Sequence, residues 1–104
     1  MGNFCLDDSF IDIFTRNAPN LNHIGIGNIK GLTSKSIFSI AENCKNLIDL
    51  NAHQMGDKIT FESFEYLFEK AKKLLVIDVS GSFGLSSSQI EKLNSQFSFL
   101  REDW

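Results

Sequence analysis

Residues 47–52 read LIDLNA, and the same pattern, a leucine followed by alternating apolar positions, returns at residues 21–26 (LNHIGI) and 74–79 (LLVIDV). The three segments begin 26 and 27 residues apart. Alternation with a period of two is typical of a short strand that buries one of its faces. A repeat of this length indicates similar units that stack on one another.

Further apolar positions keep the same register downstream of each segment. Three sets follow the segments: Leu32, Ile59 and Leu85; Ile37, Phe64 and Ile90; and Ile40, Leu67 and Leu93. A fourth set, Ala18, Cys44 and Ala71, stands three residues before each leading leucine. Residues 26 positions before Leu32, Ile37 and Ile40 are also apolar, namely Leu6, Ile11 and Phe14. The residue 26 positions after Leu74 is Leu100. The repeat therefore extends beyond three units at both ends.

The second half of each unit changes to helical spacing. Phe64, Leu67, Phe68 and Ala71 stand at i, i+3, i+4 and i+7, which is the apolar stripe of an amphipathic helix. Each expected helix is preceded by a good N-cap residue, namely Asp7, Thr33, Thr60 and Ser86. Ser86 and Gln89 also fit a capping box.

We therefore predict an α/β fold, a right-handed solenoid with a short parallel sheet on its concave side and helices on its convex side. Residues 1–104 form a single domain. It divides into an N-terminal half-repeat (6–20), three full repeats (21–46, 47–73 and 74–99) and a C-terminal tail (100–104).

Composition excludes several classes of protein. The net charge of -3 argues against binding to nucleic acid, and two cysteines are too few for a disulfide scaffold. The longest apolar stretches fall far short of the roughly 20 residues of a membrane span, and the acidic start is unlike a signal peptide. We expect a soluble cytoplasmic protein, with the nucleus as an alternative, and no contact with a membrane.

The segment with Cys44, Leu47, Leu50 and Ile59-Thr60 resembles a leucine-rich repeat of the cysteine-containing subfamily found in F-box proteins. That pattern runs C-x-x-L-x-x-L-x-L-x-x-C-x-x-I-T-D-x-G-L-x-x-L-A. Its second Cys, or the Asn of other leucine-rich repeats, would fall at Ile29, Met55 and Ser82, so the side chain that caps the backbone there must be replaced by another group. An F-box, the helical segment that precedes such repeats, is not expected within these residues.

The residues between the buried strand positions are expected to face outward on the concave side of the sheet. They are His23, Asp49, Asn51, His53, Val76, Asp78 and Ser80. Aligned laterally, His23 should neighbour Asp49, and Asn51 should neighbour Asp78. We interpret this acidic, hydrogen-bonding surface as a site for a protein partner, because repeat proteins commonly bind through their extended concave face. An ordinary solvated sheet surface is the alternative.

The two ends of the stack are a second place for a partner, since the terminal units of a solenoid expose their core unless they are capped. Ile11, Phe14 and Ala18 should line the inner stripe of the N-terminal helix, and the strand around residues 22–26 should be a sheet edge. At the C-terminus, the segment Phe97 to Trp104, which includes the predicted contact residues Phe99 and Trp104, either folds over the last unit as a cap or docks on another chain. An oligomer is a further option.

We expect neither catalysis nor a bound cofactor or metal. His23 and His53 occupy different columns of the sheet, too far apart to converge on one metal ion. Cys44 falls on the buried helical stripe, where a thiol behaves as a small hydrophobic group. No nucleophile, base and oxyanion donors can be assembled together.

The sequence therefore favours a protein-interaction module that acts as a recognition or scaffold component of a larger complex. Two alternatives keep the same fold. One is the substrate-recognition part of an F-box-like ubiquitin ligase, which the family resemblance implies. The other is a small assembly factor or accessory subunit of an organellar complex.

Overall fold

The computed structural model describes residues 7–29, 31–55, 57, 59–79, 86–96 and 99–101. For residues 90, 93–96 and 99–101 only the backbone is described. Ser80 and Trp104 lie outside the described residues, as do Leu6 and Leu85.

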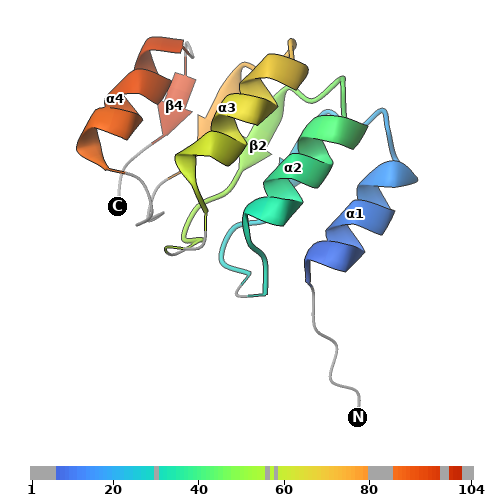
Figure 1. The fold of residues 1–104 in the computed structure, drawn as a ribbon. Coiled ribbons are helices and arrows are strands. Elements are labelled where there is room, and N and C mark those ends of the chain that lie inside the picture. Colours follow the sequence, from blue (N-terminus) through green and yellow to red (C-terminus); the bar gives the residue numbers. More distant parts are fainter. Residues whose placement is uncertain are drawn as a thin grey trace.

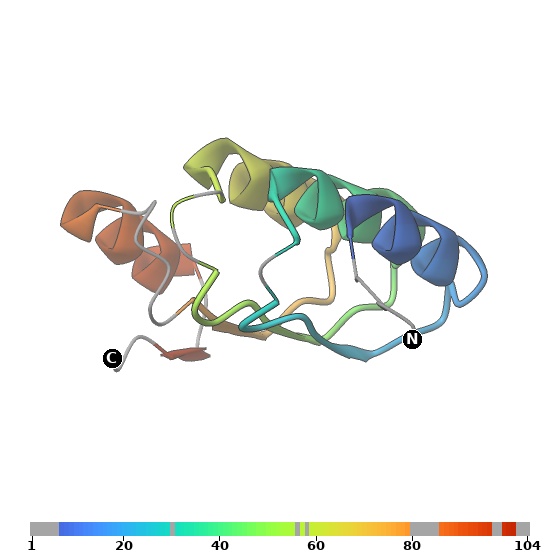
Figure 2. The ribbon, with the colours of Figure 1, turned by 90° about the horizontal axis from the view of Figure 1, so that it is seen from below.

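Helices and strands alternate along the chain (Figure 1). In order they are α1 (Asp8–Arg16), β1 (His23–Gly25), α2 (Ser34–Asn43), β2 (Asp49–Asn51), α3 (Phe61–Lys70), β3 (Val76–Asp78), α4 (Ser87–Gln96) and β4 (Phe99–Arg101). The strands form one sheet in the order β1-β2-β3-β4. The helices lie on one side of this sheet, with α1, α2 and α3 next to one another, and none of the described residues forms a helix on the other side (Figure 2). The fold is thus mixed α/β, with a short parallel sheet under a layer of helices.

The register of the sheet agrees with the lateral alignment expected from the sequence. His23 pairs with Asp49 and Gly25 with Asn51, while Asp49 pairs with Val76 and Asn51 with Asp78. All of these strand pairs are parallel.

The core lies between the sheet and the helices and consists of the repeated apolar positions. Most of those in the full units are buried, whereas Leu21 and Ile24 of the first unit are half-buried. The buried ones are Ile26, Leu32, Ile37, Ile40, Ala41, Cys44, Leu47, Leu50, Ala52, Ile59, Phe64, Leu67, Ala71, Leu74, Ile77 and Val79. Ile29 and Met55, at the position of the second family Cys, pack on this cluster or within it. Asn28 and Gln54, which precede them, both have positive φ angles, 62° and 53°. The first two strand-to-helix loops therefore make the same left-handed turn one repeat apart.

The prediction for the N-terminal helix is wrong for Phe14, whose side chain is 48% exposed. Thr15 is buried in α1 instead. Its hydroxyl donates to the carbonyl oxygen of Ile11 at 2.8 Å and accepts from Asn43 Nδ2 at 2.9 Å. The physical reason is that α1 packs against α2 on one side, and among the described residues no helix packs against its opposite side (Figure 1).

Three of the four N-caps behave as expected. Asp7 accepts from the backbone of Phe10, Thr33 accepts from that of Lys35, and Ser86 and Gln89 form the reciprocal capping box. Thr60 occupies the N-cap position of α3 but makes no side-chain cap.

A contact between units explains the exception. In α1 and α2 the side chain at the first helical position reaches the N-cap residue of the next helix: Asp8 Oδ1 accepts from Thr33 N at 2.9 Å, and Ser34 Oγ accepts from Thr60 N at 2.7 Å. The Thr60 hydroxyl is paired with Ser34 Oγ as well, at 3.2 Å, instead of with its own helix. Phe61, the next residue in this series, has no polar group, and Ser86 N is satisfied within its own capping box.

Polar side chains also connect successive units along the helix-to-strand turns, in addition to the contacts between the helix N-termini. Asn46 Nδ2 donates to Asn20 Oδ1 at 3.2 Å, and Lys73 Nζ donates to Asn46 Oδ1 at 3.1 Å. These three residues are 26 and 27 positions apart, so these contacts follow the period of the repeat.

The C-terminal end of the sheet differs from the sequence prediction. Leu100 pairs with Ile77, and not with Leu74 as the 26-residue spacing implied. Two residues separate α4 from β4, whereas five separate α2 from β2 and α3 from β3, so this turn is three residues shorter. The boundary expected between the third repeat and the tail, at 99/100, falls inside β4.

Candidate functional site

The candidate site is the face of the sheet that carries no helices, here called the open sheet face. It contains a shallow depression of about 500 Å³ lined by His23, Ile24, Gly25, Asp49, Asn51, Val76 and Asp78. Five of the predicted partner-contact residues, from three strands, are therefore brought together. Short parallel strands achieve this because every second side chain points away from the core, and the register places these side chains in rows.

A contact between an imidazole and a carboxylate crosses from β1 to β2 within this depression. His23 Nδ1 lies 3.5 Å from Asp49 Oδ2, and the two side chains are 71% and 40% exposed. Such an exposed pair contributes little to stability, about 0–1 kcal/mol. Both groups remain accessible to a partner.

Asn51 has a structural task in addition to its position in the depression. Its Oδ1 accepts from the backbone N–H of His53 at 3.0 Å and contacts His53 Nδ1 as well. The asparagine side chain thus satisfies the backbone of the loop after β2. The Cys or Asn of the leucine-rich repeat pattern would fall at Met55, and in this loop Asn51 caps part of the backbone in its place.

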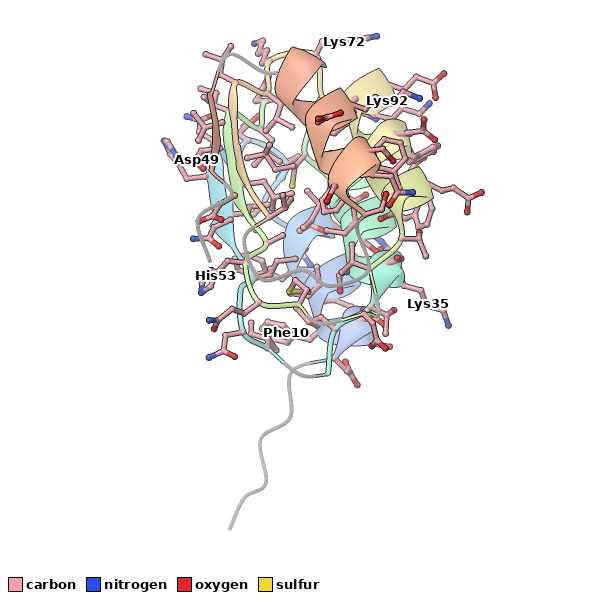
Figure 3. All side chains as sticks on the ribbon, turned by 90° about the vertical axis from the view of Figure 1, so that its left-hand side faces the viewer. Phe10, Lys35, Asp49, His53, Lys72 and Lys92 are labelled. Atoms are coloured by element: carbon pink, nitrogen blue, oxygen red, sulfur yellow. The ribbon has the colours of Figure 1, made fainter. Side chains whose placement is uncertain are left out.

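His53 does not line the depression, although its label lies on the same side of the molecule as that of Asp49 (Figure 3). Its ring is held beside Gly27: a Cβ atom on this glycine would lie 2.1 Å from His53 Nδ1. The loops after β1 and β2 also share a backbone bond, from Asn28 N to His53 O, at 2.9 Å. His53 is therefore half-buried between two loops and is a poorer contact residue than the sequence suggested.

The predicted contacts at the C-terminal end are placed only in part. Ser80 and Trp104 lie outside the described residues, and for Phe99 the backbone alone is described. The register places Phe99 beside Val76 and Arg101 beside Asp78. β4 thus extends the sheet by one strand beyond the depression.

The N-terminal end of the core carries a second, apolar depression of about 300 Å³, between α1 and β1. Phe10 and Phe14 stack there with ring centroids 6.0 Å apart, and both are more than 40% exposed. Ile24, a buried position in the repeat, is only half-buried and lines both depressions, because β1 is an edge strand. The repeat pattern did not reveal this double role, since the equivalent residues Leu50 and Ile77 are fully buried.

Other site chemistry is restricted to what the described residues offer. Among them no three His, Cys, Asp or Glu side chains are arranged to hold a metal ion. Cys44 is buried, and burial raises the pKa of its thiol, which disfavours the reactive thiolate. None of the described helices is both long and apolar enough to cross a membrane.

Comparison with solved structures shows a shared fold. A chain in the crystal structure of the Rad7 and Elc1 complex in yeast matches with a TM-score of 0.70 and 24% sequence identity. The match covers 81% of this chain and 21% of that chain. No family model matches the sequence, and no curated protein matches it either. The present chain therefore has the fold of about one fifth of a longer protein that is known from a two-protein complex.

Proposed function

We propose that this chain is a leucine-rich repeat solenoid without enzymatic activity, and that it binds a protein partner on its open sheet face. The observation that carries the proposal is the single depression in which side chains of β1, β2 and β3 converge. Its lining combines carboxylates, an imidazole and an amide with the apolar Val76 and Ile24. Polar groups set around apolar contacts are typical of recognition between proteins. The fold shared with a subunit of a protein complex supports the same role.

The first prediction concerns the two aspartates. Replacing Asp49 and Asp78 together by Ala should lower the affinity for the partner about tenfold or more, because both carboxylates lie in the depression. A tenfold change in affinity is equivalent to about 1.4 kcal/mol. The domain should stay folded, since neither residue belongs to the core. Affinity purification with mass spectrometry would identify the partner of the wild-type chain, and titration with that partner would measure the loss.

The matched control is Asp57→Ala with Glu91→Ala. It removes the same charge from exposed residues outside the open sheet face and should bind like wild type. Equal binding by all three proteins would move the partner to another surface.

The N-terminal end is the second candidate surface. Phe10, Ile13 and Phe14 are exposed there, although large apolar side chains on the surface usually have a covering partner when they cluster. Changing Ile13 and Phe14 to Ser is expected to leave the fold intact. If this variant loses the purified partner while the double aspartate variant keeps it, the contact is the end of the stack and not the open sheet face.

Two more specific roles remain alternatives. As the substrate-recognition part of an F-box-like ubiquitin ligase, the chain or a longer form of it would co-purify with an adaptor subunit of such a ligase. As an accessory subunit of an organellar complex, it would be found in that organelle by cell fractionation and not in the cytoplasm or nucleus. The family resemblance favours the first of these two.

A further inference from the structure

The helix layer carries a surface that the proposed function does not use, here called the α2–α3 surface. It is a shallow depression of about 710 Å³ lined by Phe38 of α2 and by Glu62, Glu65, Tyr66, Phe68 and Glu69 of α3. It lies on the opposite side of the molecule from the open sheet face, on the side where Lys35 and Lys92 are seen in Figure 3.

Aromatic rings form its apolar part. The Phe38 and Tyr66 rings meet between the two helices with centroids 5.2 Å apart and an angle of 58° between their planes. Phe38 is 38% exposed, so part of its ring remains open to solvent. An exposed aromatic face attracts cations through the negative potential of its π system.

Carboxylates surround these rings. Glu62, Glu65 and Glu69 follow one another at i, i+3 and i+7 on one side of α3, so the outer two are separated by about 10 Å along the helix axis. Glu65 pairs with Lys92 at 3.4 Å, whereas Glu62 and Glu69 have no ion pair within the part of the chain that the structure describes. On α2, Lys35 and Glu42 lie one turn before and one turn after Phe38, and their charges offset each other. Two accessible negative charges therefore remain beside the rings.

The chain itself shows how a lysine binds on this side of the molecule. Lys92 Nζ lies 5.5 Å from the centroid of the Phe61 ring while it pairs with Glu65. Lys70 Nζ lies 5.4 Å from the centroid of the Tyr66 ring. In each case an ammonium group is held over an aromatic ring of α3, and in the first a carboxylate holds it as well. Phe38 with Glu62 and Glu69 offers a similar combination, and none of the described lysines is placed over the Phe38 ring.

From this charge complementarity we propose that the α2–α3 surface binds a lysine- or arginine-rich segment of a protein, with a cationic side chain placed on the exposed ring of Phe38. The two glutamates, about 10 Å apart, suit basic residues spaced by two helical turns or by three residues of an extended chain. Because this surface and the open sheet face point in opposite directions, both can be occupied at once.

The test uses a fluorescently labelled helical peptide of lysine, alanine and leucine, and a second peptide with glutamate in place of lysine. Fluorescence anisotropy should show that the full chain binds the lysine peptide and not the glutamate peptide. Glu62→Lys with Glu69→Lys should reduce the affinity at least tenfold, and Glu62→Gln with Glu69→Gln should reduce it less. Phe38→Ser should weaken it as well, and circular dichroism would verify that each variant is folded.

Two controls decide the outcome. Asp57→Lys with Glu91→Lys makes the same change in net charge on exposed residues elsewhere, and it should retain the affinity. The double alanine variant of Asp49 and Asp78 should also retain it. If the first control loses the peptide as fully as the glutamate reversal, binding depends on net charge alone. If the second control loses it, the peptide binds the open sheet face. Either result, or no binding by wild type, overturns the proposal.

Discussion

Phe64→Ala is expected to lower the free energy of unfolding by about 3–5 kcal/mol, the range observed for Phe→Ala in protein cores. Phe64 is completely buried, and it is one of the largest of the fully buried side chains. It lies at the position that Ile37 occupies one repeat earlier, within the cluster that joins the sheet to the helices. A domain of this size has a total stability of about 5–15 kcal/mol, so the variant should lose a large part of its stability and unfold at a clearly lower urea concentration.

The matched variant is Phe38→Ala, in the neighbouring helix. Since its side chain is 38% exposed, it should cost about 1 kcal/mol or less. Urea unfolding followed by far-ultraviolet circular dichroism would measure both values. Similar losses for the two phenylalanines would mean that the repeat register does not define the core, and the fold described above would have to be revised.

This contrast illustrates what apolar periodicity can predict. Both residues are phenylalanines in neighbouring helices, yet Phe64 keeps the 26- to 27-residue register and Phe38 does not. A side chain that keeps the register meets the same neighbours in every unit, so spacing alone places it in the core. The same reasoning correctly aligned His23 with Asp49 and Asn51 with Asp78, because neighbouring parallel strands of equivalent units pair in register.

The register failed at the C-terminal strand for a physical reason. Leu100 is 26 residues from Leu74, but the turn between α4 and β4 is three residues shorter than the others, and Leu100 pairs with Ile77 instead. The apolar pattern predicts which residues are buried. Where several neighbouring residues are apolar, more than one register fits the pattern, so it does not predict the length of the turn. Phe99 was consequently expected in the terminal region as a capping or docking residue, whereas its backbone continues the sheet beside Val76.

Part of the candidate site could not be predicted, because polar side chains can satisfy their own loops. Asn51 faces the depression as expected, yet its Oδ1 accepts from the backbone N–H of His53, and His53 itself does not line the depression. The spacing of the repeat does not distinguish an asparagine that hydrogen-bonds to its own loop from one whose side chain is available to a partner. The α2–α3 surface was missed for a related reason: it joins Phe38 to glutamates of another unit, and none of these residues follows the apolar repeat.

The side chain of Asp8 connects the first two units through three hydrogen bonds, which the apolar pattern of the sequence did not predict. Its Oδ1 accepts from Thr33 N at 2.9 Å and from Ser36 Oγ at 2.6 Å, and its Oδ2 accepts from Thr33 Oγ1 at 2.7 Å. Thr33 is also the N-cap of α2, where a negative charge is favoured by the helix dipole. Burial by itself raises the pKa of the Asp8 carboxyl, but the hydrogen bonds from Ser36 and Thr33 outweigh it and leave this pKa below its ordinary value of 3.8.

Asp8→Asn is therefore expected to lower the free energy of unfolding at pH 7 by about 1.5–3 kcal/mol, the range for hydrogen bonds to a charged group. A carboxyl whose pKa is lower in the folded state stabilises the fold fully above its ordinary pKa, and this stabilisation is lost as the pH falls through the folded value. The difference in unfolding free energy between wild type and Asp8→Asn should thus be constant from pH 7 to about 5 and shrink below about pH 4. Urea titrations at each pH would measure it. Asp57→Asn, at an exposed loop residue, should show no such difference at any pH. A wild-type advantage over Asp8→Asn that is as large at pH 3 as at pH 7 would show that the ionised carboxylate is not what joins α1 to α2.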